Sequence, residues 1–268
     1  IYRDISWLSF NSRVLQEAAD ETVPLRERIR FLGIFSNNLD EFFRVRVATL
    51  KRMIEVGSKA RMHLEVSPGA ILEEIQEKVL EQQEAFDRIW KEILRELKKQ
   101  KIQLLNETQI NREQQKFILN YFDEEVRSHI VPLMIESIPD FPVLNDKSIY
   151  LACKLSKKDK SIPQKFALVS IPTRRLSRFL ILPSRQNEQH IILLEDVIRF
   201  CLPKIFSFFG YDSFSAHIIK VTRDAEIDIV SGLRVGADDY LTKDASLPHL
   251  AARIAALFRR ADLAATPS

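Results

Sequence analysis

The sequence predicts an α+β protein, with a helical bundle at the N-terminus followed by a domain of short strands interleaved with helices. Two observations carry this prediction. Up to residue 100 the apolar residues recur every three or four positions, which is the helical period, whereas short apolar runs of strand length appear from residue 102 onward. The 268 residues are enough for two domains of ordinary size.

The composition excludes several classes of protein. With 46% hydrophobic and 29% charged residues and only six glycines, the chain is neither disordered nor fibrous. The net charge of +3 is too small to indicate a nucleic-acid partner, and no apolar run is long enough for a transmembrane segment. Cys153 and Cys201 each lie in an apolar run, so we expect buried free thiols and a cytoplasmic protein.

The first helices are expected at residues 11–20, 24–35 and 39–55, with large apolar residues from Ile5 to Phe10 docking separately. We expect the second helix to stop at Ser36–Asn38. Asn38 then acts as the N-cap of the third helix, with Glu41 at the spacing of a capping box.

Beyond this polar stretch the third helix becomes basic. Its cations favour a solvated face, and they are also candidate ligands for a polyanion. These candidate residues are Arg44, Arg46, Lys51 and Arg52.

A long helix is expected from Pro68 to Lys99, with Ser67 as its N-cap. Gln82 is the one polar residue in its core-facing stripe. The other members of the stripe are Leu72, Ile75, Val79, Phe86, Ile89 and Ile93. A stripe of this breadth favours packing within the chain over a coiled coil with a partner.

In the second domain, helical patterns at residues 112–130 and 194–209 alternate with strand patterns. The predicted strands are 102–105, 149–155, 166–171, 179–182 and 217–221.

Three motifs together resemble bacterial polyphosphate kinase. They are ISWLSFNSRVLQEAAD at residues 5–20, FLGIFSNNLDEFFRVR at 31–46 and TRDAEID at 222–228. Their order and length make chance a poor explanation. By this resemblance residues 1–100 are a helical N-terminal domain that contacts ATP, and residues 101–228 are a head domain involved in dimerisation.

Members of that family transfer the terminal phosphate of ATP to inorganic polyphosphate. The resemblance implies that Asn38 contacts ATP from the adenine side and that the chain forms a homodimer through the head domain. It also places the family's phosphate-accepting histidine and magnesium-binding residues in C-terminal domains that have no counterpart here. Magnesium is therefore expected only in the full-length enzyme.

The residues present offer no replacement for that machinery. No phosphate-binding glycine loop occurs, and the histidines lack neighbouring carboxylates at metal or triad spacing. They are His63, His129, His190, His217 and His249. We therefore expect no catalytic and no metal-binding residue, and an inactive chain when it is alone.

From about residue 229 the chain resembles the closing third of a response-regulator receiver domain, with GADDYLTK at residues 236–243 as the specific part. In a complete receiver Lys243 would contact the aspartyl phosphate and Tyr240 would be the switch aromatic, but the phosphate-accepting aspartate has no counterpart. The segment 229–268 is therefore interpreted as a structural tail of an apparent chimera, natural or engineered. Tyr240–Thr242 is expected to add a strand to the head sheet, with one helix face packed against the sheet. The residues of that face are Leu247, Leu250, Ile254 and Leu257.

Two other functions stay open at this point. One is a non-catalytic dimerisation module or chimeric scaffold without a ligand, in which the long helix and the head domain form the interface. The other, less favoured, is a signalling fragment of the receiver type.

Overall fold

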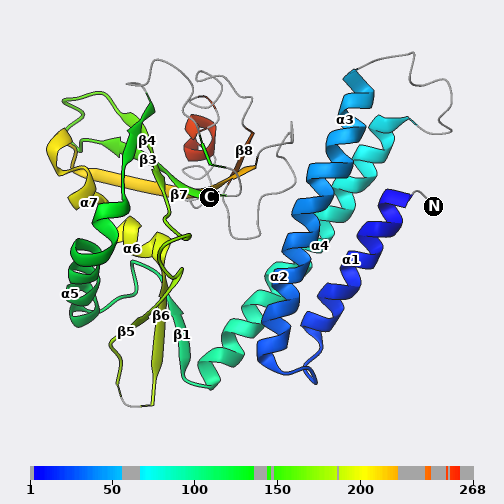
Figure 1. The fold of residues 1–268 in the computed structure, drawn as a ribbon, viewed down its shortest axis with the longest axis horizontal. Coiled ribbons are helices and arrows are strands. Elements are labelled where there is room, and N and C mark those ends of the chain that lie inside the picture. Colours follow the sequence, from blue (N-terminus) through cyan, green and yellow to red (C-terminus); the bar gives the residue numbers. More distant parts are fainter. Residues whose placement is uncertain are drawn as a thin grey trace. The chain divides into compact units, whose positions relative to one another are not determined.

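The computed structural model describes residues 3–55, 67–135, 144–145, 148–185, 187–222, 239–242, 252 and 254–259. The chain divides into two compact units, which are described separately. The N-terminal unit contains residues 1–100 and 223–236, and the head unit contains residues 101–222 and 237–268 (Figure 1). The described part of the first unit is helical and the second is built on sheets, which confirms the predicted α+β class.

The N-terminal unit is a bundle of long helices whose neighbours in sequence lie side by side (Figure 1). Its elements are α1 (Arg3–Ala19), α2 (Leu25–Phe42), the π-helical turn η1 (Phe43–Val47), α3 (Ala48–Glu55) and α4 (Pro68–Lys99). Trp7 of α1 stacks on Phe42 of α2 with ring centroids 4.7 Å apart, and Phe35 lies 5.9 Å from Phe86 of α4. Aromatic contacts thus join α2 to both of its neighbours.

The predicted break at Ser36–Asn38 is wrong, because α2 passes through these residues as regular helix. Asn38 is not an N-cap and forms no capping box with Glu41. Each Asn costs a helix about 0.7 kcal/mol relative to Ala. A buried Leu or Phe contributes about 1.5–3 kcal/mol, so the apolar stripe determines the helix. The buried stripe consists of Leu32, Phe35, Leu39 and Phe42.

The π-helical turn η1 corrects the register of this stripe. Continuing the spacing of three and four residues beyond Phe42 would place Arg46 against the core. The wider turn over Phe43–Val47 shifts the register by one residue, so Val47 and then Leu50 are buried instead. Arg46 consequently lies at the surface, half exposed, with 42% of its side chain accessible to solvent.

Three further details describe the bundle, and the first differs from expectation. Helix α1 begins at Arg3 rather than Asn11, so residues 5–10 are part of it. Arg28 of α2 is buried and donates from Nε to the carbonyl oxygen of Ala18 at 2.8 Å, near the C-terminus of α1. Val45 of η1 is 46% exposed, because the π-helical turn directs it away from the buried stripe.

Helix α4 has its predicted start and length. Ser67 is the N-cap, and its Oγ accepts a hydrogen bond from the backbone N–H of Ala70 at 3.2 Å. The polar member of the predicted stripe, Gln82, is buried as the pattern required. Burial of this helix face against α1, α2 and α3 accounts for its stability over 32 residues.

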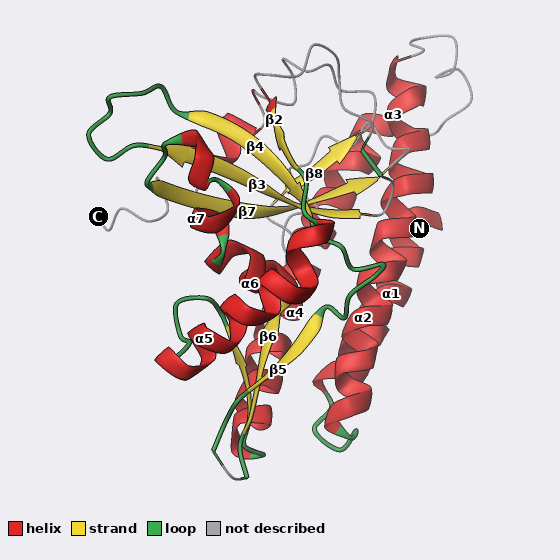
Figure 2. Cartoon of the chain, turned by 60° about the vertical axis from the view of Figure 1, so that its left-hand side comes forward, coloured by secondary structure: helices red, strands yellow, loops and turns green. Residues whose placement is uncertain are grey.

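The head unit contains two sheets (Figure 2). The first has the order β1 (Ile102–Leu105), β6 (Gln189–Leu193), β5 (Phe179–Leu182). The second has the order β2 (Pro132–Met134), β4 (Lys165–Ser170), β3 (Ser148–Ser156), β7 (Ser213–Thr222), β8 (Asp239–Thr242). Strand β1 pairs with β6 in parallel, β8 with β7 in parallel, and the other pairs are antiparallel.

The predicted strands of the head unit all form, and β7 begins earlier than expected, at Ser213. Strands β2 and β6 were not predicted. Pro132 begins β2 and polar Gln189–His190 begin β6, and these residues weaken a strand pattern.

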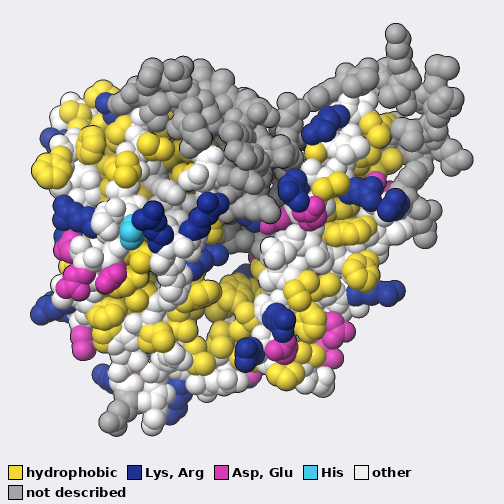
Figure 3. All heavy atoms as spheres, viewed as in Figure 1, with side chains coloured by type: hydrophobic (Ala, Val, Ile, Leu, Met, Phe, Trp, Pro, Cys, Tyr) yellow, Lys and Arg dark blue, Asp and Glu magenta, His cyan; other side chains and the backbone are white. Residues whose placement is uncertain are grey.

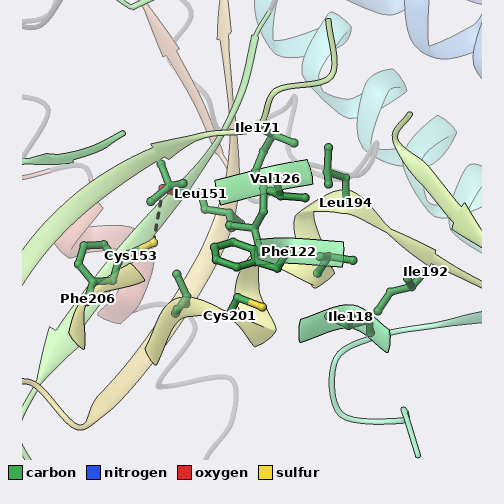
Figure 4. Packing of buried hydrophobic residues seen from close by; sticks show 14 of the residues in the cluster. Ile118, Phe122, Val126, Leu151, Cys153, Ile171, Ile192, Leu194, Cys201 and Phe206 are labelled. Carbon is green, nitrogen blue, oxygen red and sulfur yellow. Dashed lines mark hydrogen bonds between the residues drawn. The ribbon is translucent and has the colours of Figure 1, made fainter. Parts of the chain in front are cut away.

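The described helices of the head unit include α5 (Arg112–Tyr121), η3 (Phe122–Val126), η4 (Arg127–His129), α6 (Leu194–Phe200), α7 (Leu202–Ile205) and η6 (Ser207–Phe209). Four of them, α5, η3, α6 and α7, contribute buried apolar residues to the core that they share with strands of both sheets. Figure 4 shows Phe122 at the centre of this core, with Cys153 and Cys201 nearby. Both cysteines are free and buried, as predicted, and burial raises the pKa of each thiol to about 12.

The C-terminal tail completes the head unit. Strand β8 extends the second sheet at the edge of β7, and residues 254–259 are helical. Ile254, Leu257 and Phe258 are buried in a cluster with sheet residues that include Leu168 and Ile219. This confirms the predicted docking of the strand and of the helix at Ile254 and Leu257. Leu247 and Leu250 lie outside the described residues.

Phe258 makes aromatic and cation–π contacts with three side chains of the sheet. Its ring stacks on Phe166 at 5.8 Å, lies 4.9 Å from the ring of His217, and is covered by the ammonium group of Lys154 at 5.1 Å. A cation and two rings around one aromatic side chain fix the helix on the sheet.

We predict that Phe258→Ala destabilises the head unit by about 3–5 kcal/mol, the cost of emptying a buried Phe site. Native-state hydrogen exchange is the measurement, because it reports each unit separately. Protection should fall at residues 254–258 and along β3, β4 and β7. Phe208→Ala is the matched control, since Phe208 is 90% exposed, and should change protection by less than about 0.5 kcal/mol. Equal effects of the two variants would show that the tail does not stabilise the sheet.

Candidate functional site

The predicted ligand residue Asn38 lies between α2 and α1, where it contacts a second asparagine. Its Nδ2 donates to Oδ1 of Asn11 at 3.0 Å, and Nδ2 of Asn11 donates to the backbone carbonyl of Phe35 at 3.3 Å. Asn11 is completely buried, whereas Asn38 is half-buried. These two residues, called the asparagine pair below, link a core position to the surface of the bundle.

The backbone determines the orientation of both amides. The carbonyl oxygen of Phe35 can only accept, so Asn11 must direct its NH2 group toward it and its Oδ1 toward Asn38. Asn38 must then direct its own NH2 group toward Asn11. Its side-chain carbonyl oxygen consequently points away from Asn11, and one N–H of its amide stays available for another acceptor.

A second polar side chain enters the same core from α4. Nε2 of Gln82 donates to the carbonyl oxygen of Leu8 at 2.8 Å, while its buried Oε1 has no hydrogen-bond partner among the described residues. Hydrogen bonds of this kind join helices in one register, because a one-residue slip would leave buried polar groups unpaired.

Among the basic candidates, Arg44 and Arg46 are ion-paired within the N-terminal unit. Arg44 pairs with Glu41 one turn earlier, and Nε of Arg46 lies 3.7 Å from Oδ1 of Asp4 in α1. Arg52 is exposed and Lys51 half-buried. The structure therefore keeps all four cations off the core, but it sets acidic side chains beside Arg44 and Arg46.

On the face drawn in Figure 3, basic side chains are interspersed with acidic and apolar ones. The predicted local excess of positive charge is thus diluted at the surface. Exposed pairs such as Arg44–Glu41 contribute only about 0–1 kcal/mol, so a polyanion can compete for these arginines at little cost.

The cavities that open on the described surface include one in each unit. One is a groove of about 450 Å³ lined by α1 and α4. The other, of about 680 Å³, lies in the head unit beside the start of α5 and includes His190 in its lining. No group of three or more His, Cys, Asp or Glu side chains in the described part of the chain could hold a metal ion.

Sequence reasoning missed Asn11 as a member of the site. A signal was present, because Asn11 occupies a core position between Leu8 and Leu15 in the apolar stripe of α1. Among the described histidines, His190 has a carboxylate and an amide next to its ring, from Glu188 and Gln114. Glu188 precedes it by two residues and lies just before β6, so the pattern is visible only once this strand is recognised.

The head unit also contains a buried acidic cluster next to α6. Glu195 is completely buried, and Arg178 donates from Nη2 to its Oε1 at 2.5 Å and from Nε to both of its oxygens, Oε1 at 3.0 Å and Oε2 at 3.3 Å. Arg199 contacts Asp196 and lies 3.3 Å from Oε2 of Glu107. Burial raises the pKa of Asp196 to about 6, partly offset by Arg199. Each carboxylate here has an arginine partner, so the cluster is structural.

Comparisons with known proteins agree in order along the chain. The model of the polyphosphate kinase N-terminal domain matches residues 1–105, and that of the polyphosphate kinase middle domain matches residues 113–243. The second match extends beyond residue 228, where the resemblance was expected to end, and it includes β8.

The curated relatives include polyphosphate kinases of Vibrio vulnificus, 45% identical over 238 residues, and of Escherichia coli, 42% identical over 238 residues. These alignments cover 85% and 86% of this chain and 33% of each relative, so the chain spans about a third of their length. The crystal structure of polyphosphate kinase from Porphyromonas gingivalis is similar with a TM-score of 0.72 at 34% identity, over 85% of this chain and 33% of that one. No helix within the described residues is both long and apolar enough to cross a membrane.

Asp196 generates a prediction about pH. Its folded pKa of about 6 lies above the ordinary value of 3.8, so between these values the folded state binds more protons than the unfolded state. The contribution of Asp196 to the free energy of unfolding is fully present below about pH 4, and it is lost as the pH rises through 6 and the buried carboxyl group ionises. The loss is about 3 kcal/mol for a shift of this size. Asp196→Asn should flatten the fall in head-unit stability between pH 4 and 7, measured by urea unfolding at each pH.

Asp159→Asn is the matched control for this prediction. Hydrogen bonds from Ser161 lower the pKa of this exposed carboxyl group, so its titration falls below pH 4 and the window from pH 4 to 7 should be unchanged. If both variants show the slope of the unmodified chain, burial does not control the protonation of Asp196.

Proposed function

Because the chain belongs to the polyphosphate kinase family and holds its N-terminal and middle domains, we propose that it is the ATP-contacting and dimer-forming part of such a kinase. The proposed reaction transfers the terminal phosphate of ATP to inorganic polyphosphate. The chain contributes nucleotide contact and dimerisation to this reaction and is inactive alone, and magnesium acts only in the full-length enzyme.

One observation carries the nucleotide contact, which is the fixed orientation of Asn38. Adenine offers an exocyclic N–H donor next to a ring nitrogen acceptor, and an asparagine amide can contact both at once. With one N–H bonded to Asn11, Asn38 keeps its carbonyl oxygen for the donor and its second N–H for the acceptor. Asn11 thus acts as a positioning residue.

The basic residues after Asn38 form the second part of the proposal. Arg44, Arg46, Lys51 and Arg52 follow one another along η1 and α3 and are candidate contacts for polyphosphate. The ion pairs of Arg44 and Arg46 keep these side chains extended on the surface until a stronger anion replaces Glu41 or Asp4.

ATP titration by calorimetry tests the nucleotide contact. We expect Asn38→Ala to weaken ATP binding about thirtyfold, since it removes two hydrogen bonds of about 1 kcal/mol each. Asn37→Ala is the matched control, because Asn37 is the preceding residue of the same helix and is exposed. Its affinity should equal that of the unmodified chain.

Polyphosphate titration of the same protein extends this experiment. Affinity should fall with added salt and about two- to threefold in Arg52→Gln, while Arg95→Gln on exposed α4 surface serves as the control. The proposal fails if neither ligand binds, or if Asn38→Ala behaves like Asn37→Ala. In that case the asparagine pair only joins α1 to α2.

Dimerisation is proposed to use the outer side of β5. This strand lies at the edge of its sheet, and its side chains Phe179 and Ile181 are 61% and 59% exposed on one face. An exposed edge with two apolar side chains is typical of an interface.

Sedimentation equilibrium should give twice the mass of one chain without nucleotide. Ile181→Lys should weaken association about tenfold through a buried charge, whereas Val131→Lys, at another exposed position of the head unit, should not. A chain that is monomeric at all concentrations would exclude the dimer. A dimer that binds neither ATP nor polyphosphate would instead support the alternative of an interaction module without a ligand.

The tail is proposed to be a receiver-like segment of a chimera with a structural role, although the kinase middle-domain model matches as far as residue 243. Its support is the docking of β8 and Phe258 on the head sheet. The exchange experiment on Phe258→Ala tests this role. Lys243 lies outside the described residues, and signalling through it is disfavoured because no phosphate-accepting aspartate accompanies it.

A further inference from the structure

The cavity of about 680 Å³ in the head unit has no role in the proposed contacts to ATP. It lies between the first turn of α5 and the loop that leads into β6. Its lining consists of Asn111, Arg112, Glu113, Pro183, Ser184, Arg185, Glu188 and His190. Polar side chains dominate this lining, so the cavity suits a charged ligand better than an apolar one.

Gln114, beneath the cavity, determines which nitrogen of His190 carries its proton. The backbone N–H of Asn111 donates to Oε1 of Gln114 at 3.1 Å, and the carbonyl oxygen of Pro183 accepts from Nε2 at 2.9 Å. The amide therefore has one orientation, in which Nε2 also faces Nδ1 of His190 at 2.8 Å as a donor. Neutral His190 must accept at Nδ1 and carry its hydrogen on Nε2.

That Nε2–H group has no hydrogen-bond partner among the described residues, although the atom is buried. Oε2 of Glu188 lies 3.5 Å away, which is too long for a good N–H···O bond. Leaving a buried donor unpaired is costly, so a ligand oxygen at this position would gain a full hydrogen bond.

Two arginines give the cavity its cationic side. Arg112 is the first residue of α5, and its backbone is held in place by the capping box of Asn111 and Gln114. Arg185 is an exposed residue of the loop before β6. The carboxylate of Glu188 is itself 39% exposed and lies where an anion would approach His190, so it occupies this position loosely.

We propose that this cavity binds a small oxyanion of the phosphate class. The anion replaces the carboxylate of Glu188 next to His190, accepts the Nε2–H hydrogen bond and is neutralised by Arg112 and Arg185. Glu188 acts as an internal competitor that covers the buried donor when the anion is absent. The site lies wholly within the head unit, so it does not depend on the nucleotide contact proposed for Asn38.

Titration of the whole chain with inorganic phosphate tests this site, with the imidazole NMR signals of His190 as the readout and chloride keeping the ionic strength constant. We expect a saturable shift of the Nε2 signal. Tripolyphosphate in a parallel titration distinguishes the source of the anion, because tighter binding of tripolyphosphate would identify the end of a phosphate chain as the ligand.

Arg185→Gln should weaken phosphate binding about tenfold, the effect of losing one charge-assisted hydrogen bond. Arg175→Gln is the matched control, since it removes the same charge at an exposed position of the head unit outside the cavity lining. Glu188→Gln should tighten binding because it removes the competing charge.

Three results would overturn the proposal. They are a shift of equal size with chloride alone, no saturation with either phosphate, and equal affinities of Arg185→Gln and Arg175→Gln. A failure here leaves the ATP titration of Asn38→Ala unaffected, and the reverse also holds, since the two experiments observe residues of different units.

Discussion

The N-terminal unit depends on one constraint, which is that the apolar stripe running from α2 through η1 to α3 must face α1 and α4 over its full length. A helix of 3.6 residues per turn cannot keep this stripe in place past Phe42 without an adjustment, and the π-helical turn supplies it by advancing the register one residue. The same register holds Asn38 against α1. The position of the asparagine pair thus follows from the packing of the apolar stripe.

In both units a backbone group decides what a side chain offers to its neighbour. The carbonyl oxygen of Phe35 orients Asn11, which orients Asn38. In the head unit the N–H of Asn111 and the carbonyl oxygen of Pro183 orient Gln114, which fixes the hydrogen on His190. A main-chain carbonyl oxygen can only accept hydrogen bonds. It therefore fixes which end of a neighbouring side-chain amide faces it, and through that amide it fixes the hydrogen-bonding role of the next side chain. Where a buried side-chain amide contacts a backbone carbonyl, the donor and acceptor groups that the next side chain offers, here Asn38 or His190, can be predicted.

Local patterns were sufficient for much of the fold and insufficient for the site. Ser67 and Pro68 predicted the start of α4 because capping is decided within one turn, and the apolar run at residues 149–155 predicted β3. The asparagines before Asp40 gave the wrong helix boundary, since tertiary burial outweighs a preference of under 1 kcal/mol. Asn11 and Asn38 are 27 residues apart, and no spacing rule joins residues of different helices.

The tail shows what a sheet requires from the segment that completes it. An edge strand such as β7 needs hydrogen-bond partners for its free backbone groups, and an apolar sheet face needs a cover. Both needs are satisfied by any segment with a strand followed by an amphipathic helix of the right length. β8 pairs through the backbone, which is independent of sequence, and Phe258 adds the specific contacts with Phe166, His217 and Lys154. A strand followed by an amphipathic helix can therefore complete the head sheet through backbone pairing and a few apolar contacts.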